Sequence, residues 1–180
     1  MPAGEFGTIL TLNKTKERLM KHKNRTRMLT RSAAIAALYV LLTMISAAMG
    51  LDSKAVQLRL GEALTILPAF TPAAIPGLFI GCLLSNTLAG GVIWDVLFGS
   101  LATLLGALGT RLLRKNRYLA VLPPIAANTV IVPLVLRYAY SLPGSIPFFM
   151  LTVGLGEILS CGLLGLLLWR TMEKHQDRLF

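Results

Sequence analysis

Residues 111–117, RLLRKNR, set four cations between two long apolar runs. The runs cover residues 91–114 and 117–140, and each meets the length of about 20 residues that a helix needs to cross a bilayer. Loops rich in Lys and Arg stay on the cytoplasmic side of a membrane. The stretch therefore predicts a cytoplasmic turn between two transmembrane helices, and the rest of the chain can be oriented from it.

The composition is that of a membrane protein with basic edges. The chain has 180 residues, of which 54% are hydrophobic and 14% are charged, whereas a soluble domain carries about 25% charged residues. Eight of the 18 basic residues lie between Lys14 and Arg31. Cations that flank apolar spans orient a protein in the membrane and attract anionic lipid. The net charge of +10 therefore predicts membrane lipid as a partner and does not predict nucleic acid.

The sequence predicts an all-α membrane protein of six transmembrane helices with both termini cytoplasmic. Residues 60–90 hold Pro68, Pro72 and Pro76, and because proline breaks helices they predict two shorter spans there. A five-span chain would put the cluster at 111–117 outside, against the positive-inside rule. The second span is short and is expected to lean on its neighbours. The expected spans are 29–50, 60–71, 73–90, 91–114, 117–140 and 145–171.

The domain organisation follows from these spans. Residues 1–28 are expected to form a basic cytoplasmic tail, within which residues 1–7 resemble the remnant of an expression tag. Residues 29–171 form the six-helix transmembrane domain, and residues 172–180 form a cytoplasmic C-terminal tail. The sequence shows no internal repeat, and we expect no extramembrane domain within it.

The motifs of catalysis are missing from the sequence. It contains no phosphate-binding G-x-x-x-x-G-K-[ST], no H-E-x-x-H and no G-x-S-x-G. His22 and His175 lie in the tails, and Cys82 and Cys161 lie far apart in apolar runs, where we interpret them as buried packing residues. We therefore expect no enzyme activity, no metal site and no cofactor.

Three carboxylates lie within the apolar spans: Glu62, Asp95 and Glu157. A charged group near the bilayer centre costs roughly 2.5–3.5 kcal/mol, so such residues face a cavity or a partner. The expected topology places these groups from the midplane outward. This predicts a polar pocket that opens outward and is closed below by apolar packing. Other polar residues at comparable depth are Asn86, Asn128, Arg59 and Arg137.

Structural roles stay open for several of these residues. Arg59 could pair with Glu62 only to hold a loop, and Asp95 could be an interfacial residue in contact with water. Asn128 could make an interhelical hydrogen bond, which is worth about 1 kcal/mol in membranes. Trp94 could anchor the chain in the aromatic belt at the membrane surface.

Small residues form a ridge in the first span. Ala33 and Ala37 are four residues apart, and small residues at this spacing allow two helices to approach closely. The ridge serves either internal packing or the docking of a partner.

The chain resembles the QueT family over most of residues 29–171. The resemblance rests on QLRLGEAL at 57–64, Leu67-Pro68, IPGLFIGC at 75–82, DVLFGSLATL at 95–104, and Pro123-Pro124 before Asn128. QueT proteins are similar to the substrate-binding S-components of energy-coupling factor (ECF) transporters, which import vitamins and related compounds through the prokaryotic plasma membrane.

The resemblance implies a fold, partners and a cargo. The fold would be an ECF S-component-like bundle, and the partners would be a transmembrane T-component and two ECF ATPases. The cargo would be a 7-deazaguanine queuosine precursor such as preQ1. Ala33 and Ala37 match the alanine motif with which S-components dock onto the T-component.

The site residues follow from the chemistry of such a cargo. A 7-deazaguanine offers adjacent donors at N1 and the exocyclic amine, which the carboxylate of Glu157 or Glu62 could accept together. Asp95 would complement a cationic aminomethyl group, and Asn86 or Asn128 could donate to the carbonyl. Arg59 completes the polar set. Aromatic candidates for stacking on the ring are Phe79, Trp94, Phe98 and Tyr138.

Two other functions compete with this reading. The chain could be an autonomous proton-coupled transporter of a nucleobase-like compound, with Glu157 or Asp95 as the proton relay. It could also be a membrane scaffold without a small ligand, which would leave the carboxylates unexplained. The lack of an internal repeat counts mildly against the secondary transporter.

Overall fold

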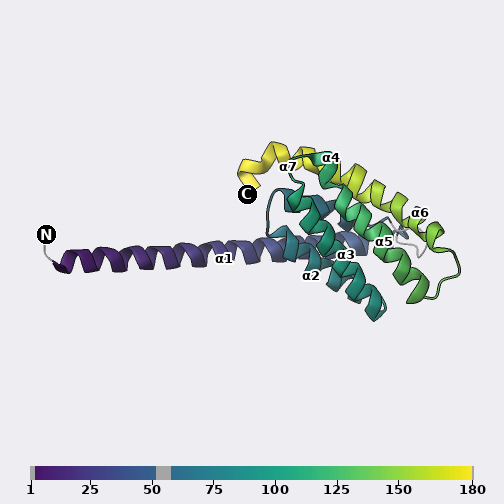
Figure 1. Cartoon of the computed structure of the whole chain (residues 1–180), viewed down its shortest axis with the longest axis horizontal. Coiled ribbons are helices and arrows are strands. Elements are labelled where there is room, and N and C mark those ends of the chain that lie inside the picture. The colour runs from purple at the N-terminus through teal and green to yellow at the C-terminus, as the bar shows by residue number, and fades with distance from the viewer. Residues whose placement is uncertain (1–2, 52–57, 180) are drawn as a thin grey trace.

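The structure is a computed structural model that describes residues 3–51 and 58–179 (Figure 1). Residues 1–2 of the tag-like start and Gln57 of the QLRLGEAL motif lie outside the described part. The described residues form helices and connecting turns, without a strand. The elements are α1 (Ala3–Ala48), η1 (Leu60–Ala69), α2 (Ala74–Leu88), α3 (Ile93–Leu112), α4 (Arg117–Ala120), α5 (Leu122–Tyr138), α6 (Ile146–Glu157), η2 (Ile158–Leu164) and α7 (Gly165–Leu179).

The apolar helices confirm an all-helical membrane protein. Within the described residues, four stretches are long and apolar enough to cross a bilayer: Met20–Ala48, Ile93–Leu112, Arg117–Tyr138 and Ile146–His175. Two shorter apolar helices, η1 and α2, occupy the region in which the sequence predicted two short spans. That the chain crosses the membrane six times, and that both termini are cytoplasmic, are still predictions.

The alternation of the helices brings distant basic segments to one end of the bundle. The N-terminal part of α1 projects away from the bundle, and α4 and the end of α7 lie at the end nearest to it (Figure 1). The connection between α5 and α6 lies at the opposite end (Figure 1). Burial of α1 in the bundle begins at Ser32, and α1 is one continuous helix through the predicted boundary between residues 28 and 29.

The short helix η1 is held by its neighbours, as the sequence predicted. It is a 3₁₀-helix with Pro68 inside it, and most of its residues are buried. The hydroxyl of Ser46 accepts from Leu60 N at 2.8 Å at the start of η1. At its end, Arg111 donates to the carbonyl oxygens of Pro68 and Ala69 at 3.1 and 3.2 Å. These bonds satisfy backbone groups that a helix terminus leaves without partners.

Glycines allow α2 to pack closely against α1. A Cβ atom at Gly81 would lie 2.9 Å from Cβ of Tyr39, and one at Gly77 would lie 2.8 Å from the carbonyl oxygen of Ser32. The hydroxyl of Ser32 also donates to the carbonyl oxygen of Ala73 at 2.8 Å. This close approach packs α1 tightly against the bundle and places Tyr39 in the hydrophobic core of the bundle.

Candidate functional site

Glu62 and Glu157 meet in the interior of the bundle. Glu62 lies on η1 and is 2% exposed, and Glu157 is the last residue of α6 and is 5% exposed. Together with Cys161 they present ligand atoms that all lie within 4.8 Å of one another. Two carboxylates buried this close repel each other in a medium of low dielectric constant, so their surroundings must supply donors.

Those donors come from three further elements. Tyr39 on α1 donates its hydroxyl to Oε1 of Glu62. Asn128 on α5 donates from Nδ2 to Oε1 of Glu157 at 2.9 Å, and Cys161 on η2 donates from Sγ to Oε2 of Glu157 at 3.1 Å. We name these five residues the inner cluster. The inner cluster ties α1, η1, α5, α6 and η2 together at one point.

A π-helical segment shapes the inner cluster. The segment η2 begins directly after Glu157 and carries Cys161 four residues further on. Thr65 links η1 to η2. Its Oγ1 donates to the carbonyl oxygen of Glu62 at 2.6 Å and contacts Sγ of Cys161 at 3.3 Å. Single π-helical turns within α-helices occur frequently at functional sites, and this one directly follows the buried carboxylate Glu157.

A second group of polar residues, the outer cluster, surrounds Asp95. Arg59 donates to Oδ1 of Asn86 at 3.2 Å, and Nδ2 of Asn86 donates to the carbonyl oxygen of Asp95 at 3.4 Å. Tyr140 donates its hydroxyl to Oδ2 of Asp95 at 2.9 Å. We define the outer cluster as Arg59, Asn86, Asp95 and Tyr140. Asn86 and Asp95 are 3% and 9% exposed, so this cluster is also largely shielded from the surroundings.

Both clusters contain polar residues that the sequence predicted for the site. The structure therefore brings together six of the residues predicted from the sequence. They are Glu157, Glu62 and Asn128 in the inner cluster, and Asp95, Asn86 and Arg59 in the outer cluster.

The predicted aromatic residues lie elsewhere. Trp94, Phe98 and Tyr138 are 55%, 44% and 72% exposed, and they line an apolar groove on the outside of the bundle. Trp94 and Phe98 stack on each other with ring centroids 6.0 Å apart. Phe79 is partly buried on α2. The structure thus separates the three exposed rings from the buried carboxylates.

Sequence reasoning missed four members of the site: Tyr39, Thr65, Tyr140 and Cys161. Cys161 is buried, as predicted, but it also donates to Glu157. Its position four residues after Glu157 was the signal, because residues at that spacing share a helix face. Tyr39 is the tyrosine of the first span, and a buried tyrosine hydroxyl usually needs a hydrogen-bond partner.

The side chains of the inner cluster are suited to two kinds of ligand, a metal ion or an organic molecule. Carboxylate oxygens and a cysteine sulfur are ligands of zinc, and Glu62, Glu157 and Cys161 are close enough together to hold a metal ion. The same carboxylates can accept hydrogen bonds from an organic ligand, because a carboxylate has about four acceptor positions and can take a bidentate partner. Glu157 uses one position on each oxygen for Asn128 and Cys161.

Ionisable residues inside a bundle of apolar helices often mark the path or site of a transported ion or solute. The family model described as QueT transporter matches residues 29–174. The chain belongs to the QueT transporter family, which confirms the resemblance seen in its sequence. It is a family of transporters and not of enzymes. No curated protein and no solved structure matches the chain.

Proposed function

We propose that the chain is the substrate-binding S-component of an ECF importer in a prokaryotic plasma membrane. It captures a 7-deazaguanine queuosine precursor of the preQ1 type from outside and delivers it inward. A T-component and two ATPases would supply the energy, because the sequence has no phosphate-binding loop of its own. Membership of the QueT family supports transport, and the buried pair Glu62 and Glu157 is the observation that carries the choice of cargo.

Glu157 suits the donor edge of the guanine-like ring. N1–H and the exocyclic amine are adjacent donors, and one carboxylate can accept both in a bidentate arrangement. Hydrogen bonds to a charged group contribute about 1.5–3 kcal/mol. Asn128 holds Oε1 of Glu157 at 2.9 Å, so the carboxylate is oriented before the ligand arrives. This preorganisation lowers the entropy cost of binding.

A cationic cargo fits the charge of the site. Glu62, Glu157 and Asp95 are all buried, and Arg59 is the cation of the outer cluster. An aminomethyl group is protonated at neutral pH, so its charge would complement a buried carboxylate. We assign Asp95 to the amine and the amide of Asn86 or Asn128 to the ring carbonyl. PreQ0, which carries a neutral nitrile, would lose the charge complementarity.

Burial of the carboxylates means that binding needs an opening movement. Glu62 and Glu157 are 2% and 5% exposed, so helices must part before a cargo reaches them. Stacking by Trp94, Phe98, Tyr138 or Phe79 would need a rearrangement of these rings during that movement. Closure around the bound ring would exclude water and strengthen the polar contacts.

The outer face of α1 fits the proposed T-component. Ala33 and Ala37 are exposed, whereas Ala36 and Tyr39 on the opposite side of the helix are 6% and 0% exposed. An exposed ridge of small residues lets the backbone of another helix approach closely. This supports docking as the role of the ridge, in place of packing within the chain.

The secondary transporter stays the second candidate. The contact between Glu62, Glu157 and Cys161 favours it, because chains of carboxylates form proton relays in transporters. Uptake of preQ1 into liposomes separates the two functions. The proposed S-component takes up preQ1 only with the T-component, the ATPases and ATP. Uptake by this chain alone, driven by a pH gradient, would establish the secondary transporter instead.

A further inference from the structure

A groove on the surface of the bundle lies apart from both polar clusters. It runs between α4 on one side and η2 with α7 on the other. Its apolar wall is exposed, since Ile158, Leu159, Leu163 and Leu167 are each about half accessible, at 52%, 49%, 57% and 51%. These residues belong to the apolar stretch Ile146–His175. An exposed apolar wall on a candidate membrane span is suited to contact with lipid acyl chains.

One end of the groove is basic. Arg117 and Arg170 line it together with Tyr118, whereas the neighbouring Arg114 and Lys115 are not part of its lining. Guanidinium groups bind phosphate through paired N–H donors. An apolar trough that ends in two arginines is complementary to a ligand with an acyl chain and an anionic headgroup.

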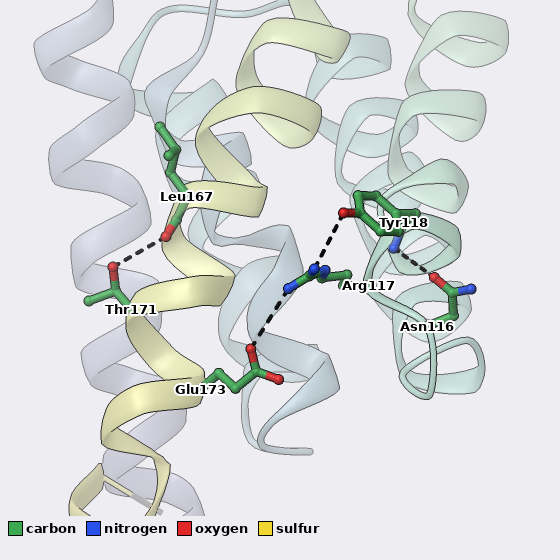
Figure 2. A network of polar contacts seen from close by, with 6 residues as sticks. All are labelled: Asn116, Arg117, Tyr118, Leu167, Thr171 and Glu173. Atoms are coloured by element: carbon green, nitrogen blue, oxygen red, sulfur yellow. Dashed lines mark hydrogen bonds and ion pairs between the residues drawn. The ribbon is translucent and has the colours of Figure 1, made fainter.

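Arg117 has N–H donors with which it can bind such a headgroup. Its guanidinium lies 5.1 Å from the centre of the Tyr118 ring, and Nη2 donates to the Tyr118 hydroxyl at 3.3 Å. The ion pair with Glu173 joins Nη1 to Oε2 at 4.0 Å between exposed side chains (Figure 2). A pair of that length in water is weak. Arginine has five N–H donors, so a phosphate can bind without displacing Tyr118.

We propose that this groove binds one anionic phospholipid, with its phosphate on Arg117 and Arg170 and an acyl chain along η2 and α7. The lipid would bridge α4 and α7. The proposal does not depend on the transported cargo, because neither cluster of buried carboxylates lines the groove. Recognition of anionic headgroups by basic pockets between transmembrane helices has the same physical basis.

The test measures retention of phosphatidylglycerol by the full chain. Native mass spectrometry after purification compares phosphatidylglycerol with phosphatidylcholine of the same acyl chains. The wild type should retain the anionic lipid in preference. Arg117→Gln/Arg170→Gln should weaken that retention about tenfold or more, since each cation near the headgroups contributes about 1 kcal/mol. Arg114→Gln/Lys115→Gln removes the same charge from residues that do not line the groove and should keep it.

Gly162 provides a second variant that leaves every charge in place. A Cβ atom there would lie 3.8 Å from Ile158 and 3.9 Å from Ile125, which is ordinary contact. Gly162→Leu would add a side chain at a position that lines the groove, and it should lower retention of phosphatidylglycerol. Equal retention by the two double variants, or by Gly162→Leu and the wild type, would overturn the proposal. Displacement of the signal by inorganic phosphate alone would also overturn it, because it would show a headgroup site without an acyl chain.

Discussion

Asn128 donates a 2.9 Å hydrogen bond to Glu157 across the interface of α5 and α6. Both side chains are buried, at 3% and 5% exposure. The bond fixes one oxygen of a carboxylate that lies within a few ångströms of a second carboxylate, Glu62. A carboxylate buried inside a bundle of apolar helices is a costly arrangement, which the proposed polar cargo would explain.

Replacing Glu157 by Gln should weaken the binding of preQ1. The variant loses a charged acceptor for the two ring donors, and a hydrogen bond to a charged group is worth about 1.5–3 kcal/mol. The dissociation constant should therefore rise roughly 10- to 100-fold, as measured by titration calorimetry in detergent. Glu173→Gln is the control, because Glu173 is an exposed residue of α7 and its variant should bind like the wild type. Equal affinities for Glu157→Gln and Glu173→Gln would remove Glu157 from the site.

Removing the Tyr39 hydroxyl should destabilise the bundle. Tyr39 is 0% exposed and donates to Glu62, so Tyr39→Phe takes a donor away from a buried carboxylate. A lost partner of this kind costs about 1–3 kcal/mol, which should lower the thermal unfolding midpoint in detergent. Tyr138→Phe makes the same chemical change at a residue that is 72% exposed and should leave the midpoint in place. A Tyr39→Phe midpoint matching that of the wild type would argue against a structural role for the bond.

Cys161→Ser separates an organic ligand from a metal ion. Serine can still donate to Oε2 of Glu157, so the inner cluster keeps its hydrogen bonds and preQ1 affinity should change by less than about threefold, under 1 kcal/mol. A zinc site would instead lose its sulfur ligand. Elemental analysis of the purified wild type and calorimetry of the variant distinguish the two. Bound zinc in the wild type that disappears with Cys161→Ser would contradict an organic cargo at this position.

Bulky residues on the alanine ridge should block assembly without affecting the cargo. Ala33→Leu/Ala37→Leu places larger side chains on the exposed face of α1, which prevents close approach of a partner helix. Copurification with the T-component should fall, while preQ1 affinity stays at the wild-type value. Ala47→Leu/Ala48→Leu changes two exposed alanines further along the same helix and is the matched control. Normal assembly of the Ala33→Leu/Ala37→Leu variant would assign the ridge to another role.

The helices could be predicted because their ends and lengths depend on local features of the sequence. The prolines between residues 60 and 90 predicted two short helices, and η1 and α2 are found there, with the chain turning near Pro72. The cost of a charged group in lipid predicted that Glu62, Glu157 and Asp95 would face a cavity or a partner, and all three are buried. The cost of burying a charged side chain depends on the residue type and on its position in a span, and both can be read from the sequence.

The partners of those carboxylates were harder to predict. Tyr39 and Cys161 reach them through the rotation of α1 and the π-helical turn of η2, and helix rotation depends on packing between several elements. The aromatic residues Trp94 and Phe98 were expected near the cargo, yet they face outward and stack on each other. A ring suits both a lipid-facing position and a stacking site, so residue type alone could not distinguish the two.

The central claim is that Glu62 and Glu157 hold the cargo, and a structure of the chain with bound preQ1 tests it most directly. We predict the 7-deazaguanine ring in the interior of the bundle, with its N1–H and exocyclic amine within hydrogen-bond distance of Glu157, about 2.7–3.2 Å. Glu62 would lie beside the ring. The account would be contradicted by a ring bound in the apolar groove on the outside of the bundle, between Trp94, Phe98 and Tyr138, with the inner cluster unchanged.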